Sequence, residues 1–133
     1  MSTPLGVVQR DPDSEEFLEA ASQRKFVVYR CRSCGFVGGP QEKVCSKCSS
    51  SDTEQCAASG RARVVSWSVV YGKGSDGDFV PQAVVVIGEL DEGPWWWSQV
   101  LGAEPSDMTT GRRLRILFET ADGGETLPVF ALD

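Results

Sequence analysis

Beyond residue 60 the apolar positions form short alternating or continuous runs separated by turn residues, a pattern typical of β-strands. The clearest alternation places Leu114, Ile116 and Phe118 on one face of a strand. The five predicted strands span residues 61–71, 82–90, 95–101, 112–119 and 127–132. Five strands joined mainly by turns predict a small closed or nearly closed barrel, and the OB-fold is the commonest five-stranded barrel of this size.

Helical character is confined to the N-terminal region. Residues 11–16 predict the start of a helix. Asp11 or Asp13 can cap it, Pro12 fits its first turn, and acidic side chains near this end interact favourably with the helix dipole. The apolar stripe that follows comprises Phe17, Leu18 and Ala21. This helix should end near Arg24, and because it is short and acidic we expect it to pack on its own domain or on another subunit.

Two Cys-x-x-Cys pairs stand ten residues apart between the helix and the barrel. They are Cys31, Cys34, Cys45 and Cys48. Zinc takes four thiolates tetrahedrally at about 2.3 Å, and such a closed shell leaves no position for water or substrate. The spacing therefore predicts a structural zinc site.

Two alternatives to zinc use the same cysteines. Two disulfides are disfavoured because the chain shows no secretion signal and a bond within Cys-x-x-Cys is usually redox-active. An iron site of the rubredoxin kind has the same ligands and stays open. The fifth cysteine, Cys56, is interpreted as an inert spare thiol outside the metal site.

The segment around the cysteines has β-rich residues at 26–30 and turn-forming glycines and a proline at 35–40. It predicts a zinc ribbon of two short hairpins, with too little apolar content to fold without the ion. The predicted domains are a leader and helix at 1–24, the zinc ribbon at 25–59 and the OB-fold at 60–133.

The chain has no histidine, which removes the commonest general base, and no motif that we interpret as an active site. Its net charge is −6, but residues 24–48 carry +5, so the other 108 residues carry −11. The basic residues of that segment are Arg24, Lys25, Arg30, Arg32, Lys43 and Lys47. They could bind phosphate groups, or they could only offset the negative charge of the thiolates.

Three consecutive tryptophans lie in the third predicted strand. Alternation puts Trp95 and Trp97 on one face and Trp96 on the other, and a barrel interior cannot easily hold all three. At least one indole should therefore lie outside as part of a binding surface, unless loops cover it. Base stacking is disfavoured, since residues 61–133 carry a net −5 that repels a phosphate backbone.

Hydrophobic residues make up 41% of the chain, and no run reaches the 18 or more apolar residues that a membrane span needs. The first residues lack a basic region followed by an apolar one. We therefore expect a cytoplasmic protein without a membrane partner.

The order of helix, ribbon and barrel resembles the DUF35 family of thiolase-associated OB-fold proteins. The resemblance covers residues 11–132. The matching residues are Phe17, Arg30-Cys31-x-x-Cys34-Gly35, Pro40, Cys45-x-x-Cys48, Ser59-Gly60-Arg61, Leu90-Asp91-Glu92-Gly93-Pro94, Gly111 and Leu127-Pro128-Val129-Phe130. Proteins of this family bind thiolase-fold enzymes and help to complete their acyl-CoA sites.

The resemblance implies a non-catalytic partner subunit of a thiolase-fold enzyme acting on acyl-CoA thioesters, for example a steroid side-chain aldolase or lyase. It implies that the helix and the barrel surface dock the partner, and the candidate contacts are Phe17, Trp95, Trp96 and Trp97. The three tryptophans exceed what the family pattern leads us to expect and indicate a more apolar interface. It makes Arg24, Lys25 and Lys47 candidates for coenzyme A phosphates. The alternatives are a protein that binds single-stranded nucleic acid and a stand-alone acyl-CoA-binding protein.

Overall fold

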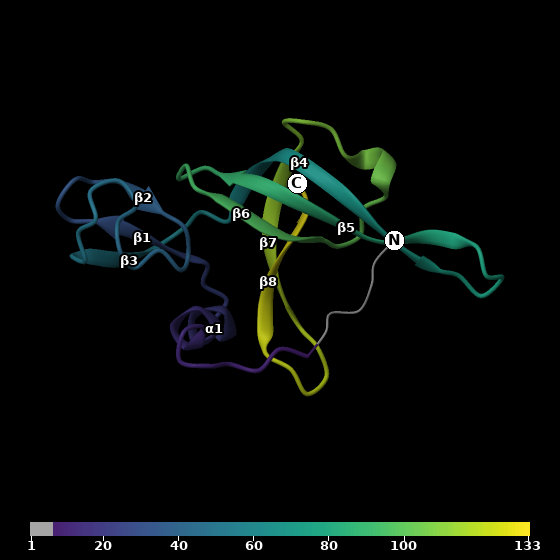
Figure 1. Ribbon diagram of the computed structural model, residues 1–133, viewed down its shortest axis with the longest axis horizontal. Helices are drawn as coiled ribbons and strands as arrows, with labels where there is room; N and C mark the ends of the chain where they lie inside the picture. The colour runs from purple at the N-terminus through teal and green to yellow at the C-terminus, as the bar shows by residue number, and fades with distance from the viewer. Residues whose placement is uncertain (1–6) are drawn as a thin grey trace.

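The computed structural model describes residues 7–133, which form one helix, a three-stranded sheet and a five-stranded closed barrel in chain order (Figure 1). The N-terminal part holds the helix α1, Glu15–Ser22, and the ribbon strands β1, Val27–Cys31, β2, Val37–Gly38, and β3, Thr53–Ala57. The barrel strands are β4, Arg61–Lys73, β5, Phe79–Leu90, β6, Trp95–Val100, β7, Arg113–Thr120, and β8, Thr126–Leu132. A 3-10 turn, η1, spans Pro105–Asp107. The predicted fold class is confirmed.

The five barrel strands follow the order β4-β5-β6-β8-β7, and β7 returns to β4. All neighbours are antiparallel except β6 and β8, which meet in parallel at Val100 and Phe130. The closing pair is short, because β4 meets β7 only at Arg61–Arg63. One further step of backbone bonding at Val64, to Gly111 and Arg112, ends the closure.

The predicted ribbon of two hairpins is wrong in its strand count. The structure has a three-stranded sheet with β1 in the centre, between β2 and β3. We did not predict β3, because Thr53–Ala57 is polar and half-exposed and shows little apolar pattern. It pairs along the whole of β1 and places Cys56 opposite Val28, three residues from Cys31 along β1.

The helix begins later than predicted. Asp11 and Ser14 bond each other in both directions, since the Asp11 carboxylate accepts from the Ser14 amide at 2.8 Å and the Ser14 hydroxyl accepts from the Asp11 amide at 3.0 Å. This closed turn precedes the helix, so that Ser14 and neither aspartate takes the N-cap position. The last helical residue is Ser22, and Arg24 then adopts a left-handed φ of 60° that turns the chain into β1.

Four aromatic rings join the helix, the ribbon and the barrel. Phe26, which leads into β1, packs edge-on against Trp96 of β6, with ring centroids 4.8 Å apart. Trp96 in turn packs on Phe130 of β8 at 5.3 Å, and Phe17 of α1 lies 6.2 Å from Phe26. Edge-to-face packing at such distances adds about 0.5–1.5 kcal/mol per pair beyond the buried area. The cluster therefore fixes the position of the N-terminal elements on the barrel.

Gly88 makes room for this cluster. It lies in β5 directly opposite Trp96, and a Cβ atom at this position would stand 2.7 Å from the Cζ atom of Phe130. The strand could carry a side chain here only by displacing that ring.

We predict that Gly88→Ala lowers the free energy of unfolding by about 1–3 kcal/mol, because overpacking forces a core ring out of its rotamer. Urea denaturation followed by tryptophan fluorescence measures the change. Gly39→Ala is the control, since its Cβ would have its nearest neighbour at 3.6 Å, and it should cost less than about 0.5 kcal/mol. Equal stabilities of the Gly88→Ala variant and the wild type would contradict the prediction.

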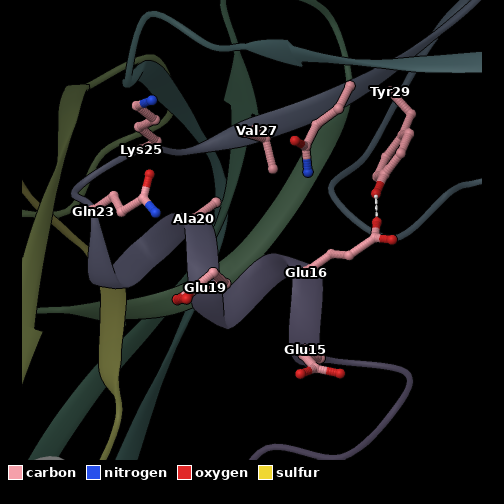
Figure 2. A pocket seen from close by; sticks show the side chains of 9 residues that line it. Glu15, Glu16, Glu19, Ala20, Gln23, Lys25, Val27 and Tyr29 are labelled. Carbon is pink, nitrogen blue, oxygen red and sulfur yellow. Dashed lines mark hydrogen bonds between the residues drawn. The ribbon is translucent and has the colours of Figure 1, made fainter.

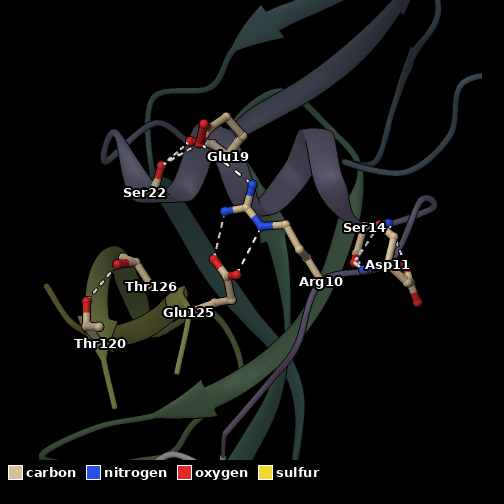
Figure 3. A network of polar contacts seen from close by, with 8 residues as sticks. All are labelled: Arg10, Asp11, Ser14, Glu19, Ser22, Thr120, Glu125 and Thr126. Atoms are coloured by element: carbon tan, nitrogen blue, oxygen red, sulfur yellow. Dashed lines mark hydrogen bonds and ion pairs between the residues drawn. The ribbon is translucent and has the colours of Figure 1, made fainter. Parts of the chain in front are cut away.

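A second attachment ties the start of the described chain to the β7–β8 turn. The Arg10 guanidinium donates two hydrogen bonds to the Glu125 carboxylate, at 2.8 and 3.0 Å, and also lies 3.8 Å from Glu19 of α1 (Figure 3). Figure 3 also shows Thr120 and Thr126 bonded across the base of the same turn, at 2.6 Å. Hydrogen bonds from Arg10 lower the pKa of the Glu125 carboxyl.

This pair predicts a pH dependence of stability. Because the folded-state pKa of Glu125 lies below that of the unfolded chain, about 4.3, its stabilisation is complete at neutral pH. It is lost as the pH falls through the lowered folded-state value. The difference in Tm between the wild type and Glu125→Gln should shrink between pH 7 and pH 3. A difference that stays constant would contradict this, and Glu119→Gln is the control.

Within the part of the chain that the structure describes, α1 is too short and too polar to cross a bilayer, and no other helix is long enough.

Candidate metal centre and docking surface

The four cysteines converge at one end of the ribbon. All four Sγ atoms lie within 4.8 Å of one another. The Sγ atoms of Cys31 and Cys48 are 3.5 Å apart, and those of Cys34 and Cys45 are 3.6 Å apart. A tetrahedral ion with bonds of about 2.3 Å would separate its sulfur ligands by about 3.8 Å. The cysteines are free thiols, at distances far above the roughly 2.05 Å of a disulfide.

The two cysteine turns have the same backbone geometry. The amide of Gly35 donates to the carbonyl of Cys31 at 2.9 Å, and that of Ser49 donates to the carbonyl of Cys45 at 2.8 Å. Gly35 and Ser49 both adopt a left-handed φ, of 80° and 64°. Both Cys-x-x-Cys units therefore form the same type of turn, which brings the two thiols of each unit close together.

The backbone prepares these thiols for a cation. Hydrogen bonds from the amides of Cys34 and Ser33 lower the pKa of the Cys31 thiol to about 6, and those of Cys48 and Lys47 lower the pKa of Cys45. At Cys48 the Ser50 amide also lowers the pKa, but the contact with Cys31 and desolvation outweigh it and raise the value to about 12. The four cysteines can hold a metal ion as thiolates, and binding of the ion would release the protons that they carry. Cys56 lies outside the cluster, as predicted.

We predict that Cys45→Ser abolishes stoichiometric metal binding and unfolds residues 27–57, because the ribbon folds around the ion. Metal analysis of the purified protein gives the first readout, and the amide signals of β1 and β3 in an NMR spectrum give the second. Cys56→Ser is the matched control and should keep one bound ion per chain. A folded ribbon in the Cys45→Ser variant would refute the structural role of the site.

The tryptophans are arranged as their alternation predicts. Trp95 and Trp97 are 50% and 66% exposed on the outside of the barrel, whereas Trp96 packs into the aromatic cluster. The Trp95 indole donates to the Glu89 carboxylate on the neighbouring strand at 3.3 Å. This bond orients one of the two exposed rings.

Two grooves border these indoles. A groove of about 350 Å³ runs between α1, the ribbon and β6. Its lining residues are Phe17, Gly39, Pro40, Gln41, Glu42, Trp95, Trp96 and Trp97. A second groove of about 180 Å³ lies between β4, β5 and β6, lined by Ser66, Trp67, Ser68, Val85, Val86, Ile87 and Trp97. Trp97 lines both grooves, and Val85 and Ile87 lie on the same face of the sheet as Trp95 and Trp97, so we call these four residues the tryptophan face.

Sequence reasoning did not single out Trp67 as a site residue. It lies in the predicted strand at residues 61–71, and its side chain is 39% exposed. Phe17 was singled out, and its ring is shared between the aromatic cluster and the first groove.

The three candidates for phosphate binding are not brought to one place. Arg24 and Lys25 line a pocket of about 200 Å³ between the start of β1 and the half-buried Ile116 and Phe118 of β7. The Arg24 guanidinium donates to the carbonyl of Phe118 at 3.5 Å. Lys47 lies in the second cysteine turn and does not line this pocket.

A wider groove, of about 530 Å³, separates α1 from the ribbon sheet (Figure 2). Its walls carry Glu15, Glu16 and Glu19, which makes it unsuited to phosphate. The Tyr29 hydroxyl donates to the Glu16 carboxylate across it at 2.7 Å, as Figure 2 shows. Desolvation and this hydrogen bond raise the pKa of Tyr29 to about 12. The pair braces the helix against the ribbon.

Two family models match adjoining parts of the chain. "ChsH2, rubredoxin-like zinc ribbon domain" covers residues 18–54, and "ChsH2, C-terminal OB-fold domain" covers residues 55–119. Together they span the ribbon and most of the barrel.

Two curated relatives have similar sequences. The "Probable enoyl-CoA hydratase alpha subunit" of Thermomonospora curvata is 30% identical over 118 residues, 89% of this chain and 37% of the relative. The "DUF35 domain-containing scaffold protein" of Methanocaldococcus jannaschii is 31% identical over 90 residues, 67% of this chain and 64% of the relative. The chain thus spans less than two thirds of either relative.

Two solved structures have the same fold. A chain of an "Ltp2-ChsH2(DUF35) aldolase" superposes with a TM-score of 0.78 at 30% identity, over 94% of this chain and 98% of that one. A protein of unknown function from the DUF35 family of Sulfolobus solfataricus superposes with a TM-score of 0.67 at 18% identity, over 92% and 86% of the two chains.

Proposed function

Because the chain belongs to the ChsH2 (DUF35) family of zinc-ribbon and OB-fold proteins, we propose that it is a non-catalytic partner subunit of a thiolase-fold enzyme acting on acyl-CoA thioesters. The observation that carries this proposal is the tryptophan face. Trp95 and Trp97 expose large apolar rings side by side, next to a groove that reaches the helix and the ribbon. Tryptophan is among the residues that contribute most to protein interfaces.

The chemistry of the side chains supports a binding role over a catalytic one. The chain has no histidine, and the four cysteines leave a bound ion no open position. We take the ion to be zinc, which would hold the two cysteine turns together and keep the ribbon against the aromatic cluster. Its part in the function is to shape the surface that the partner meets.

We assign the partner's reaction to carbon–carbon cleavage of a bulky acyl-CoA, of the kind that steroid side-chain degradation requires. One support is the similar chain that assembles in an Ltp2-ChsH2(DUF35) aldolase. The apolar character of the tryptophan face is another. The hydratase name belongs to a relative of which this chain spans 37%, so it carries little weight here. Arg24 and Lys25 would hold coenzyme A phosphates at the edge of the partner's site, and Lys47 lies apart from them.

The test is co-expression with the thiolase-fold protein encoded beside this chain. We expect a stable heteromer that cleaves the thioester, and no activity from this chain alone. Trp95→Ala with Trp97→Ala should weaken the heteromer by more than about tenfold, because anchor residues of an interface contribute about 2 kcal/mol or more. Calorimetry gives the affinities.

Phe36→Ala is the matched control, since Phe36 is an exposed ring of the ribbon that lines neither groove of the tryptophan face. It should change the affinity by less than about twofold. Failure of the wild-type chain to co-purify would refute the proposed function. A double tryptophan variant that binds like the wild type would refute the assigned surface.

A further inference from the structure

Strands β4 and β5 continue beyond the barrel as a two-stranded arm. The contact of β4 with β7 ends at Val64, where a bulge separates the register pairs Val64–Gly88 and Ser66–Ile87. On the other side, β5 has no contact with β6 before Val84. From Val70 and Ala83 to Lys73 and Phe79 the two strands pair only with each other, and Figure 1 shows them extending away from the barrel. We call residues 70–83 the arm.

The arm is apolar but contributes nothing to the core. No residue between 66 and 83 belongs to the buried core cluster. Val70, Tyr71 and Phe79 are 47%, 58% and 70% exposed. An isolated two-stranded hairpin is marginally stable in water, so such side chains are expected to meet another surface.

The two edges of the arm differ in their protection. On β5 the edge carries Pro81, which has no amide hydrogen to offer, and an extra residue at Gln82 that breaks the register. On β4 the residues from Val65 to Gly72 include no proline and no charge. Within the described chain, β5 is the only strand that pairs with this part of β4. A bare, uncharged edge of this length is a template for strand addition.

The root of this edge is strongly basic. Two arginine pairs lie directly across from each other on β4 and β7, Arg61 with Arg115 and Arg63 with Arg113, and Arg112 precedes them. Like charges in such positions destabilise a sheet. Arg61 forms an ion pair with Asp133 at 3.3 Å, and Arg63 lies directly across from Glu89 on β5. Among the described residues, Arg112, Arg113 and Arg115 have no ion pair within 4.0 Å, so carboxylates beside Arg112 would relieve the repulsion.

Building on the proposed function, we infer that the β4 edge from Ser66 to Gly72 binds an extended segment of the partner enzyme as an additional strand. Backbone hydrogen bonds would bind the segment along the edge, its apolar side chains would cover Val70 and Tyr71, and carboxylates at its end would meet the arginines. The partner enzyme is the favoured occupant because Ser66 and Ser68 of this edge line the same groove as Trp97, so that the edge adjoins the tryptophan face.

Amide hydrogen exchange on the assembled heteromer tests this directly. The thiolase-fold protein encoded beside the chain is the binding partner in this experiment. In the free chain the amides of residues 66–72 that point away from β5 should exchange rapidly, and in the heteromer at least about tenfold more slowly. A heteromer that forms without protecting these amides would overturn the inference while leaving the proposed function intact. A chain that forms no heteromer would overturn both.

Lysine substitutions that add charge to the β4 edge test the same inference independently, through the affinity of the heteromer. Val70→Lys with Tyr71→Lys should weaken the heteromer by more than about tenfold, because charged side chains on an edge strand oppose strand addition. Phe79→Lys is the matched control, an exposed apolar residue of the same arm on the other strand, and should have less than about twofold effect. Equal losses in both variants would show a nonspecific apolar contact and overturn the inference. So would a dimer of this chain alone that the double variant dissociates.

Discussion

The packing of Phe26 and Trp96 is the contact on which the arrangement of the three parts depends. A short acidic helix and a small ribbon cannot bury enough apolar surface to fold alone. Both gain it from one ring cluster, in which Trp96 bridges the ribbon to Phe130 in the barrel. Gly88 is required because only a residue without a side chain leaves room for the Phe130 ring.

The metal site and this cluster act at opposite ends of the ribbon. The four thiols close the two turns at one end, and Phe26 anchors the other end to the barrel. The ribbon segment 39–42 forms one wall of the groove beside the tryptophans, and Phe17 of the helix forms another part of its lining. The proposed binding surface is therefore composite, since the ribbon, the helix and the barrel all contribute to it.

The barrel itself is closed at one end and extended at the other. Closure by β7 stops at Val64, and beyond it Val70 and Tyr71 of β4 and Phe79 of β5 are exposed. The strands β4 and β5 are therefore longer than closure of the barrel requires, and their additional residues include exposed apolar side chains. A protein that works alone would carry this exposed edge as a liability. In a subunit of a larger assembly the same edge is available for contact with the partner.

By itself the sequence determined the fold class, the four cysteines that converge at one point and the placement of Trp96 on the other face from Trp95 and Trp97, because these follow from local spacing and from the period of two along a strand. It did not determine the start of the helix, since the bonds between Asp11 and Ser14 compete with helical capping, or the polar strand β3, which is ordered by pairing with β1. The exposure of Trp67 and the separation of Lys47 from Arg24 and Lys25 were decided by the tertiary structure alone. Burial and proximity depend on where a distant strand such as β7 stops, and no local pattern records that point.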